Sequence, residues 1–597
     1  MSGATEVSGV GRSLRPAVML APAAVAALVV VAGWAALRGA EPGVGFGMPD
    51  PPSSWMVVAA PVLRLVVTEV GGTCLGLLVS GRHATDRALS WTGVLAAAWA
   101  GAAFLGSVLL VVLQLGRGGL EVLGRPTVLL HAMVTFGEPA AMLLAAAIGA
   151  VVTVVVGLRE SAPPVGVAAL AAVGVLAPAV TGPTTRTGTG HDLVTDAAVF
   201  ATLAGAVWLG VTVHGLIDGA GFPGAGCTQR AVTAGAVTLA ATLLGAAVLV
   251  QGEWLASLHG RWAGLQVVLL GCALVLTLRR AGPAPVVATL LAAAAAGAAA
   301  VIEPPPALLL PATMQQMMVG FDVPERPSAL GLAAPGRLDL LWAVVGVTLA
   351  VGYVLRWRRA GDRRRSRLVC WLAGCALLVV TTSSTLGALS MAVFSAHMAV
   401  HMVLAVLVPL FLVLGGPLTL VDRAPLDTPA VRVLTHPAVS LTVFVGSMLV
   451  LYNTPLFAAI LPSHWAHQVL AAVVLVSGYA FLWPIVGVDP APRPLPHVAR
   501  LALLLASMPF HAFFGVALLG ATEVIGATYY ERLEVSWVGD LLADQRLGAM
   551  IAWGAAEASL LGVLAIVLVR WGREDRRPGH AGPSPWDAMV ADLARRR

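Results

Sequence analysis

Charged residues are scarce in this sequence. Only 11% of its 597 residues are Asp, Glu, Lys or Arg, whereas 58% are hydrophobic. The mean hydropathy of +0.88 is too high for a chain that folds around one core in water. The composition therefore excludes a soluble enzyme and indicates that lipid surrounds most of the chain. We predict an all-α fold, a polytopic bundle of transmembrane helices.

Cysteine is also rare, and nucleotide-binding motifs are missing. The five cysteines form no CxxC pair, so the sequence offers neither a disulfide framework nor a thiolate metal site. No GxxxxGK[ST] loop occurs, so ATP-driven transport is not expected. We expect a protein that is not an enzyme. Its net charge of +6 lies largely in predicted cytoplasmic loops and the tail, which explains the charge without a nucleic acid partner.

Apolar runs of roughly 20 residues recur along the chain, each long enough to cross a hydrocarbon core of about 30 Å as a helix. We predict about sixteen spans. They begin near Ala17, Met56, Ala88, Glu138, Pro164, Asp192, Ala231, Gly260, Ala284, Leu338, Leu368, Phe394, Ala438, Ala466, His497 and Leu547. The first run, Ala17 to Leu37, is long enough to be an anchor, and no clear signal-peptide cleavage site follows it.

Arginine-rich loops give the orientation, because positively charged loops stay in the cytoplasm. Seven arginines lie between Arg356 and Arg367, and four more lie between Arg570 and Arg577. Both segments should be cytoplasmic. Alternation through an even number of spans then places the N-terminus, with Arg12 and Arg15, in the cytoplasm as well.

A segment rich in proline and methionine, residues 303–337, interrupts the hydropathy pattern. Alternation of the spans places it outside the cell, so we predict an extracytoplasmic linker. No close internal repeat relates the parts on either side, which indicates a fusion of two different modules. We expect a membrane domain at residues 1–302, a second one at residues 338–573, and a cytoplasmic tail at residues 574–597.

Two histidines in one predicted span, His397 and His401, are spaced i, i+4. This spacing places both imidazoles on one helix face, where they can reach one metal ion. Met398 and Met402 repeat the spacing on a neighbouring face. Imidazole with thioether is a ligand set suited to copper. The alternative is that the histidines only hydrogen-bond neighbouring helices.

Other polar residues should reach the same outer depth of the membrane. His467 lies near the outer end of its span, His511 should rise to a similar depth, and Glu557 lies in the outer half of the last span. Ionisable groups inside membranes are costly and usually functional, so this convergence favours a metal site. Glu557 could instead pair with a neighbouring helix.

An ordered series of motifs resembles the polytopic CtaG-type cytochrome c oxidase assembly proteins, over about residues 338–573. The series comprises HMAVHM at 397–402, the LGGP turn at 414–417, His436-Pro437, Tyr452 to Pro455, His467, Trp483-Pro484, Asp489-Pro490, His511 to Gly515, Asp544-Gln545 and Trp553 to Glu557. The resemblance implies a protein of the bacterial plasma membrane that helps deliver copper to the haem–copper centre. Its implied partners are the copper ion and subunits of cytochrome c oxidase.

The N-terminal half resembles the CopD family of copper-resistance and copper-uptake membrane proteins, over roughly Trp91 to Arg280. The resemblance rests on GHDLVTDAAVFATLAGAVWLG at 190–210, QRA at 229–231 and HGR at 259–261. One departure is Gln266, where that family leads us to expect a lysine. The resemblance implies copper transport, and the departure puts transport competence in doubt.

Three polar positions in this half suggest an outer copper-uptake site. His191 lies at the outer mouth of one predicted helix, and His131 with Glu138 lies near the outer start of another. The alternative is that His191 caps its helix or faces water. Arg64 and Glu69, within one span, are predicted to form a structural pair. In the linker, Met314, Met317 and Met318 could capture copper(I) or simply pack.

We therefore predict a membrane copper-handling protein, whose first half takes up or holds copper and whose second half passes it to a nascent oxidase. One competing hypothesis is a membrane haem protein, because histidines on neighbouring helices also bind haem iron. The other is a metal-free assembly scaffold, whose histidines hold helices together.

Overall fold

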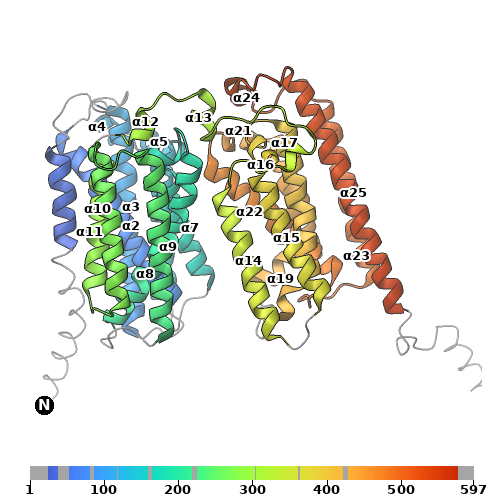
Figure 1. Ribbon diagram of the computed structural model, residues 1–597, viewed down its shortest axis with the longest axis horizontal. Helices are drawn as coiled ribbons and strands as arrows, with labels where there is room; N and C mark the ends of the chain where they lie inside the picture. Colours follow the sequence, from blue (N-terminus) through green and yellow to red (C-terminus); the bar gives the residue numbers. More distant parts are fainter. Residues whose placement is uncertain are drawn as a thin grey trace, which may run out of the picture. The chain divides into compact units, whose positions relative to one another are not determined.

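The computed structural model describes residues 24–37, 53–80, 86–116, 119–158, 165–217, 225–302, 304–360, 364–420 and 428–575. These residues are all-helical and contain no β-strand beyond an isolated bridge between Pro335 and Ser384. Twelve of their helices are long and apolar enough to cross a membrane. The chain divides into two compact units, Met1–Gly320 and Phe321–Arg597, so the boundary lies inside residues 303–337 (Figure 1).

The helices match the predicted spans in place but not entirely in number. Twelve of the sixteen predicted spans coincide with the twelve long apolar helices. The other four coincide with shorter apolar helices, Ala24–Leu37, Val165–Val180, Ala284–Ala300 and Pro437–Asn453. By length and composition the described residues thus support twelve spans. The predicted cytoplasmic N-terminus, with Arg12 and Arg15, and the tail from residue 576 onward lie outside the described residues.

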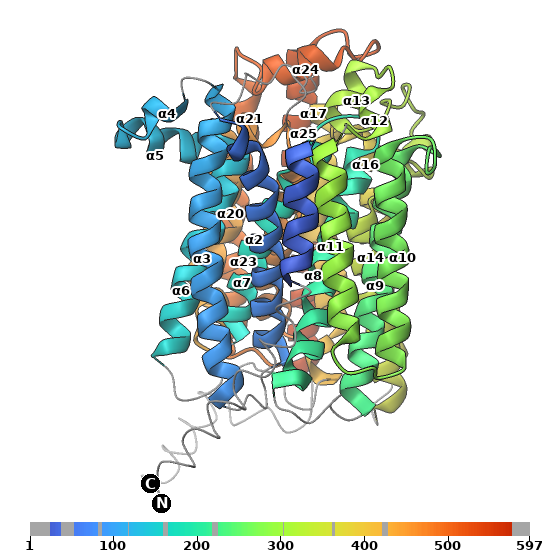
Figure 2. The same ribbon diagram turned by 90° about the vertical axis from the view of Figure 1, so that its left-hand side faces the viewer.

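The N-terminal unit is a bundle of helices that approach one another closely through small residues. Its longer helices are α2 (Ser54–Ser80), α3 (Asp86–Leu115), α6 (Gly137–Gly157), α7 (Val165–Val180), α8 (His191–Ile217), α9 (Ala225–Val250), α10 (Leu258–Leu278) and α11 (Ala284–Ile302). Figure 2 shows α2, α3 and α11 running along this unit. Gly76 of α2 meets Gly210 of α8 so closely that a Cβ on either would overlap the other's backbone. Small residues allow this contact, as is usual between helices in membranes.

Shorter helices complete the N-terminal unit. They are α4 (Gly119–Val122), α5 (Pro126–Thr135), α12 (Pro306–Leu309) and α13 (Met314–Val319). The last two belong to the segment predicted as a linker, and α13 leads to Gly320, whose carbonyl accepts a hydrogen bond from Gly190 N–H at 2.6 Å. Residues 304–320 therefore pack on this unit.

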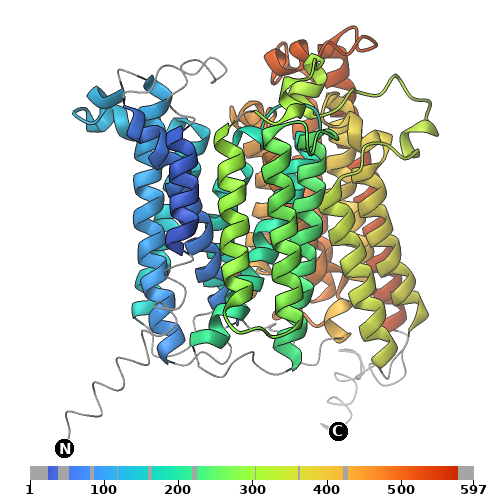
Figure 3. The same cartoon turned by 60° about the vertical axis from the view of Figure 1, so that its left-hand side comes forward.

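Among the described residues, the C-terminal unit contains eight longer helices, two of which, α17 and α18, belong to one span. They are α14 (Leu340–Arg359), α15 (Arg365–Ser383), α17 (Phe394–Met402) with α18 (Val408–Gly415), α20 (Pro437–Asn453), α22 (His464–Val486), α23 (His497–Leu519) and α25 (Leu541–Asp575). Figure 3 shows α14 and α15, in yellow, side by side. The span that contains α17 and α18 is the most enclosed: 67% of an apolar 18-residue stretch of it is buried, against 17% to 56% for the corresponding stretches of the unit's other long apolar helices. This span is therefore the centre of the unit.

Short helices close the two ends of the C-terminal unit. α16 (Thr385–Leu389), α21 (Leu456–Ile460) and α24 (Ala527–Leu533) lie at the end where α17 begins, and α19 (Pro429–Leu434) lies at the other end (Figure 1). The arginines at the end of α14 and the start of α15 lie at the α19 end. If arginine-rich loops face the cytoplasm, α17 begins on the outer side.

Asp489 stabilises the arginine-rich end of this unit by hydrogen bonds. Its carboxylate accepts backbone N–H bonds from Leu418 at 3.0 Å and Thr419 at 3.1 Å, just after the left-handed residue Gly416. Burial raises the pKa of the Asp489 carboxyl, and the two N–H donors and the Arg367 charge oppose that rise. The LGGP turn is therefore tied to the segment that follows α22.

A π-helical segment, Val403–Leu407, joins α17 to α18. Its cause is Pro409, which has no N–H to offer the carbonyl of Ala405 four residues earlier and whose ring would clash with that carbonyl in an α-helix. The chain widens instead, and Val408 N–H bonds to the carbonyl of Val403. Gly478 of α22 packs against this segment, where a Cβ would overlap the Ala405 carbonyl oxygen.

We expect Gly478→Ala to destabilise the C-terminal unit by about 1–3 kcal/mol, because the added methyl group overpacks a close helix contact. Thermal unfolding of the purified protein in detergent would measure the loss. Gly562→Ala in α25 is the matched control, because no atom lies within 4 Å of the added Cβ. The control should be neutral or slightly stabilising, since Ala favours helix over Gly. Equal melting temperatures for the two variants would contradict the proposed close contact.

Candidate functional site

His397 and His401 lie one turn apart on α17 and are buried, with 6% and 7% of their surface exposed. Their ring centroids are 6.1 Å apart. The hydroxyl oxygen of Tyr452, on α20, lies 2.8 Å from His397 Nε2 and 3.0 Å from His401 Nδ1. The i, i+4 spacing thus places both rings on one face of α17, as predicted. Both rings contact the same phenol oxygen, that of Tyr452.

The hydrogen bonds at Tyr452 fix the roles of three groups. A phenol has one hydrogen to donate and lone pairs to accept. Tyr452 therefore donates to one imidazole and accepts from the N–H of the other. Both rings therefore make their hydrogen bonds to Tyr452 in the neutral form, which is also the form that binds metal ions.

His467 and His511 approach this pair from two other helices. The His467 ring, on α22, has its centroid 6.2 Å from that of His397. Its Nδ1 donates to the Ser463 carbonyl at 3.2 Å, while its buried Nε2 has no hydrogen-bond partner among the described residues. In α23, His511 Nδ1 donates to the Ser507 carbonyl at 3.0 Å.

Both of these histidines have a backbone carbonyl at Nδ1, which leaves the lone pair on Nε2. Histidines that ligate metals are commonly held in this way, with the other ring nitrogen bonded to a carbonyl or carboxylate. His467 and His511 are therefore in the tautomer suited to ligation. The ring of His511 also packs against Phe444, with centroids 5.5 Å apart.

The remaining candidates of this unit are two methionines and one glutamate. Met398 is fully buried and turns toward α25, where its Cγ lies 3.2 Å from the position a Cβ would take on Gly548. Met402 is buried. Glu557, on α25, is partly exposed and makes no hydrogen bond or ion pair with the part of the chain that the structure describes. Within that part, no three His, Cys, Asp or Glu side chains form a ready metal cluster.

Aromatic rings enclose the Tyr452 hydroxyl. The ring centroids of Phe457, Phe514 and Phe394 lie 4.9, 5.3 and 6.1 Å from that of Tyr452. Phe457 is fully buried and lies 5.0 Å from the His397 ring. This shell keeps water from the site and strengthens the electrostatic interactions inside it.

Polar contacts surround the N-terminal end of α17. Asp544, at the start of α25, accepts the Ser395 N–H at 3.2 Å. Gln545 is fully buried and bonds to Ile525 N–H at 2.8 Å and to the Glu523 carbonyl at 3.1 Å. Tyr529 donates to the Met391 carbonyl at 2.8 Å. Burial raises the pKa of the Tyr529 hydroxyl far above its ordinary value, so it stays a donor.

Tyr452 is the site residue that the sequence reasoning missed as a functional group. It appeared only inside a family motif, with no role assigned. A signal existed: tyrosine is rare in this chain, with five in all, and this one lies in an apolar run. The partner helix of α17, however, could not be identified from spacing within either helix.

In the N-terminal unit, the proposed uptake residues do not meet as one cluster. His191 begins α8 and is buried, with Nδ1 2.9 Å from the Gly188 carbonyl, so the alternative that it faces water is wrong. His131, on α5, is exposed and makes no side-chain hydrogen bond to His191 or Glu138. The structure thus places these two histidines in different surroundings.

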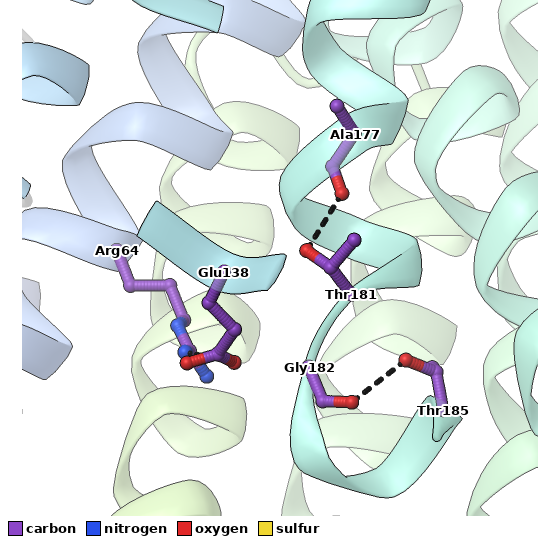
Figure 4. Close-up of polar contacts among 6 residues, drawn as sticks. All are labelled: Arg64, Glu138, Ala177, Thr181, Gly182 and Thr185. Atoms are coloured by element: carbon purple, nitrogen blue, oxygen red, sulfur yellow. Dashed lines mark hydrogen bonds and ion pairs between the residues drawn. The ribbon is translucent and has the colours of Figure 1, made fainter. Parts of the chain in front are cut away.

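Glu138 forms an ion pair with Arg64, at 2.8 Å between Oε1 and Nη2. Figure 4 shows this pair facing the segment that contains Thr181 and Thr185, whose hydroxyls bond to the carbonyls of Ala177 and Gly182. The predicted pair of Arg64 with Glu69 is therefore wrong. Residues five apart point about 140° away from each other around a helix, so Arg64 reaches the neighbouring helix α6 instead.

Comparison with known proteins finds a family model that matches part of the C-terminal unit. The family described as Cytochrome c oxidase caa3 assembly factor (Caa3_CtaG) matches residues 350–574. This stretch contains the histidine pair, Tyr452, His467 and His511. The match leaves the N-terminal unit without a family assignment.

Relatives with no described function match about half of the chain. An uncharacterized protein of Mycobacterium bovis is 38% identical over 302 residues, which are 47% of this chain and 46% of that protein. One of Mycobacterium leprae is 37% identical over 319 residues, 48% of each chain. The aligned part thus spans about half the length of these relatives. No solved structure matches the chain.

We expect Asp544→Ala to destabilise the protein by about 0.5–2 kcal/mol, because the first turn of α17 loses the acceptor for Ser395 N–H. Thermal unfolding in detergent would measure the change. Glu531→Ala is the control, since Glu531 is exposed on the same outer segment and its side chain makes no hydrogen bond to described residues. If both variants unfolded at the wild-type temperature, the contact of Asp544 with α17 would have no energetic role.

Proposed function

We propose that the C-terminal unit holds a copper ion at His397 and His401 and supports its delivery to the haem–copper centre during assembly of cytochrome c oxidase. The observation that carries the proposal is the meeting of two buried imidazoles at one oxygen atom, inside the stretch that matches the oxidase assembly family. Copper is the cargo in this role. The unit acts in assembly and not as an enzyme.

The donors present fit such a cargo. Imidazole nitrogen is a common ligand of copper, and a neutral ring offers one nitrogen without a hydrogen, which a change of tautomer can direct at the ion. His467 offers a buried Nε2 with no other partner, and His511 is held in the same tautomer. Met398, Met402 and Glu557 are proposed as further donors to the ion, with Met398 turned toward α25.

The site lies at the end of the unit opposite its arginine-rich loop. If that loop faces the cytoplasm, the site opens toward the outer half of the membrane. Copper would then reach it from outside the cytoplasm. The proposed partners are the subunits of the oxidase, which receive the ion.

We further propose that the N-terminal unit takes up or holds copper. The support is the resemblance of residues 190–210, with His191 buried at the start of α8 and His131 exposed on α5. Met314 and Met317, which are 54% and 41% exposed, offer thioether sulfurs near the end of this unit. Thioethers favour copper(I), so these residues suit capture of the reduced ion.

A metal-free scaffold is the competing function, and one observation favours it. Tyr452 already satisfies both imidazoles by hydrogen bonds, as residues that only join helices would be satisfied. The two functions differ in whether the purified protein contains metal. The haem hypothesis predicts a Soret band in the same preparation.

Replacing both His397 and His401 with Ala should abolish copper binding, with a loss of affinity well beyond the roughly hundredfold typical of residues that only support a metal ligand. The helix should persist because Ala favours it. Metal analysis of the purified protein would measure binding, and the copper-to-haem ratio of isolated oxidase would measure delivery. The ratio should fall in the double variant.

His436→Ala is the control for loss of an imidazole, since His436 precedes α20 at the end of that helix distant from Tyr452. It should leave both measurements unchanged. Normal copper content of the double variant, together with a normal oxidase ratio, would refute delivery through this pair.

A further inference from the structure

We infer that the phenol oxygen of Tyr452 is a third copper ligand, and that the resulting donor set is built for copper(II) and not for copper(I). This inference rests on the copper site proposed at His397 and His401. It goes further by naming a ligand and the oxidation state of the ion.

The spacing of the three donor atoms supports the inference. Ligands about 2.0–2.1 Å from a metal ion and at right angles to each other lie about 2.9 Å apart. The Tyr452 oxygen lies 2.8 Å from His397 Nε2 and 3.0 Å from His401 Nδ1. These two distances match the length of two adjacent edges of a square-planar or tetragonal site, with oxygen at the shared corner.

The chemistry of the donors points to the divalent ion. Nitrogen and oxygen ligands in tetragonal arrangements suit copper(II), whereas thioether and thiolate sulfur select copper(I). The thioether next to His397 in the sequence, that of Met398, packs against α25. No cysteine occurs on α17, α20, α22 or α23. The atoms that meet at this point are thus hard or borderline donors.

The bonding of Tyr452 differs from that of other buried tyrosines in the same unit. Tyr353 donates to the Gly415 carbonyl at 2.7 Å, and Tyr529 donates to the Met391 carbonyl at 2.8 Å. These hydroxyls are anchored by backbone. The Tyr452 hydroxyl bonds to two imidazoles, so its position is set by groups that can themselves bind a metal.

Packing holds the phenol in place for this role. Tyr452 is buried, and the rings of Phe457 and Phe514 contact its ring. The oxygen is therefore preorganised beside the two nitrogens, and little ordering remains when an ion binds. On binding, the ion takes the place of the phenol hydrogen, which leaves as a proton. The imidazole that donated its N–H to the phenol moves that hydrogen to its other ring nitrogen, so that both nitrogens facing the ion offer a lone pair.

The variant that tests the inference is Tyr452→Phe, which removes one oxygen atom and keeps the packed ring. Copper(II) would be titrated into the purified full-length protein, and copper(I) would be titrated under reducing conditions without oxygen. We expect wild type to bind copper(II) with a visible phenolate-to-copper absorption band. The variant should lose the band and bind copper(II) roughly tenfold to a hundredfold more weakly, with little change for copper(I).

Tyr479→Phe on α22 is the matched control, because it removes a phenol oxygen that has no hydrogen-bond partner among the described residues. It should match wild type in both titrations. Resonance Raman spectra of wild type with copper(II) test the ligand without any variant. Phenolate vibrations should be enhanced by excitation in the visible band.

Each contrary result has a distinct meaning. Equal or tighter copper(II) binding by Tyr452→Phe, or a Raman spectrum without phenolate vibrations, would overturn the role of Tyr452 as a ligand. Binding of copper(I) but not copper(II) by wild type would overturn the oxidation state and leave a copper site at the histidines. Binding of neither ion by wild type would overturn the proposed function itself.

Discussion

Inside a membrane, a polar group removed from water must find its partner within the protein, and this requirement organises the C-terminal unit. Two imidazoles on α17 share one phenol from α20, and the imidazoles of His467 and His511 bond to carbonyls of their own helices. The Asp489 carboxylate takes two backbone N–H groups at the opposite end. The contacts of Tyr452 and Asp489 join segments distant in sequence, and the carbonyl contacts fix the tautomers of His467 and His511. Contacts that stabilise the bundle therefore also fix the positions of these four imidazoles.

The sequence predicted the features that depend on residues close together along the chain. Apolar runs located the helices, and the i, i+4 spacing correctly placed His397 and His401 on one face. Contacts between helices could not be predicted in this way. The partner of Arg64 is Glu138 on another helix, and Tyr452 meets the histidines from 51 residues away. Local periodicity carries no information about which helices become neighbours.

Residues 303–337, between the two predicted membrane domains, show a second limit of prediction from composition alone. Their prolines interrupt the hydropathy pattern. Composition did not reveal that residues 304–320 pack on the first unit, or that residues 321–337 pack on the second, where Trp537 Nε1 donates to the Pro324 carbonyl at 3.2 Å. The arrangement depends on tertiary hydrogen bonds, which proline-rich composition neither requires nor excludes.

The π-helical turn after His401 changes the direction in which the side chains of α18 point relative to those of α17. A π-helical turn accommodates one residue more than the α-helix around it, so side chains beyond it are turned by about 100° relative to an uninterrupted helix. A single helical wheel drawn through residues 394–415 would therefore assign the faces of α18 wrongly. Sequence changes that lengthen or shorten this turn by one residue would re-aim α18, with the LGGP turn, while the histidines kept their direction. The turn thus lets the end of the span that carries His397 and His401 vary independently of the end that carries the LGGP turn.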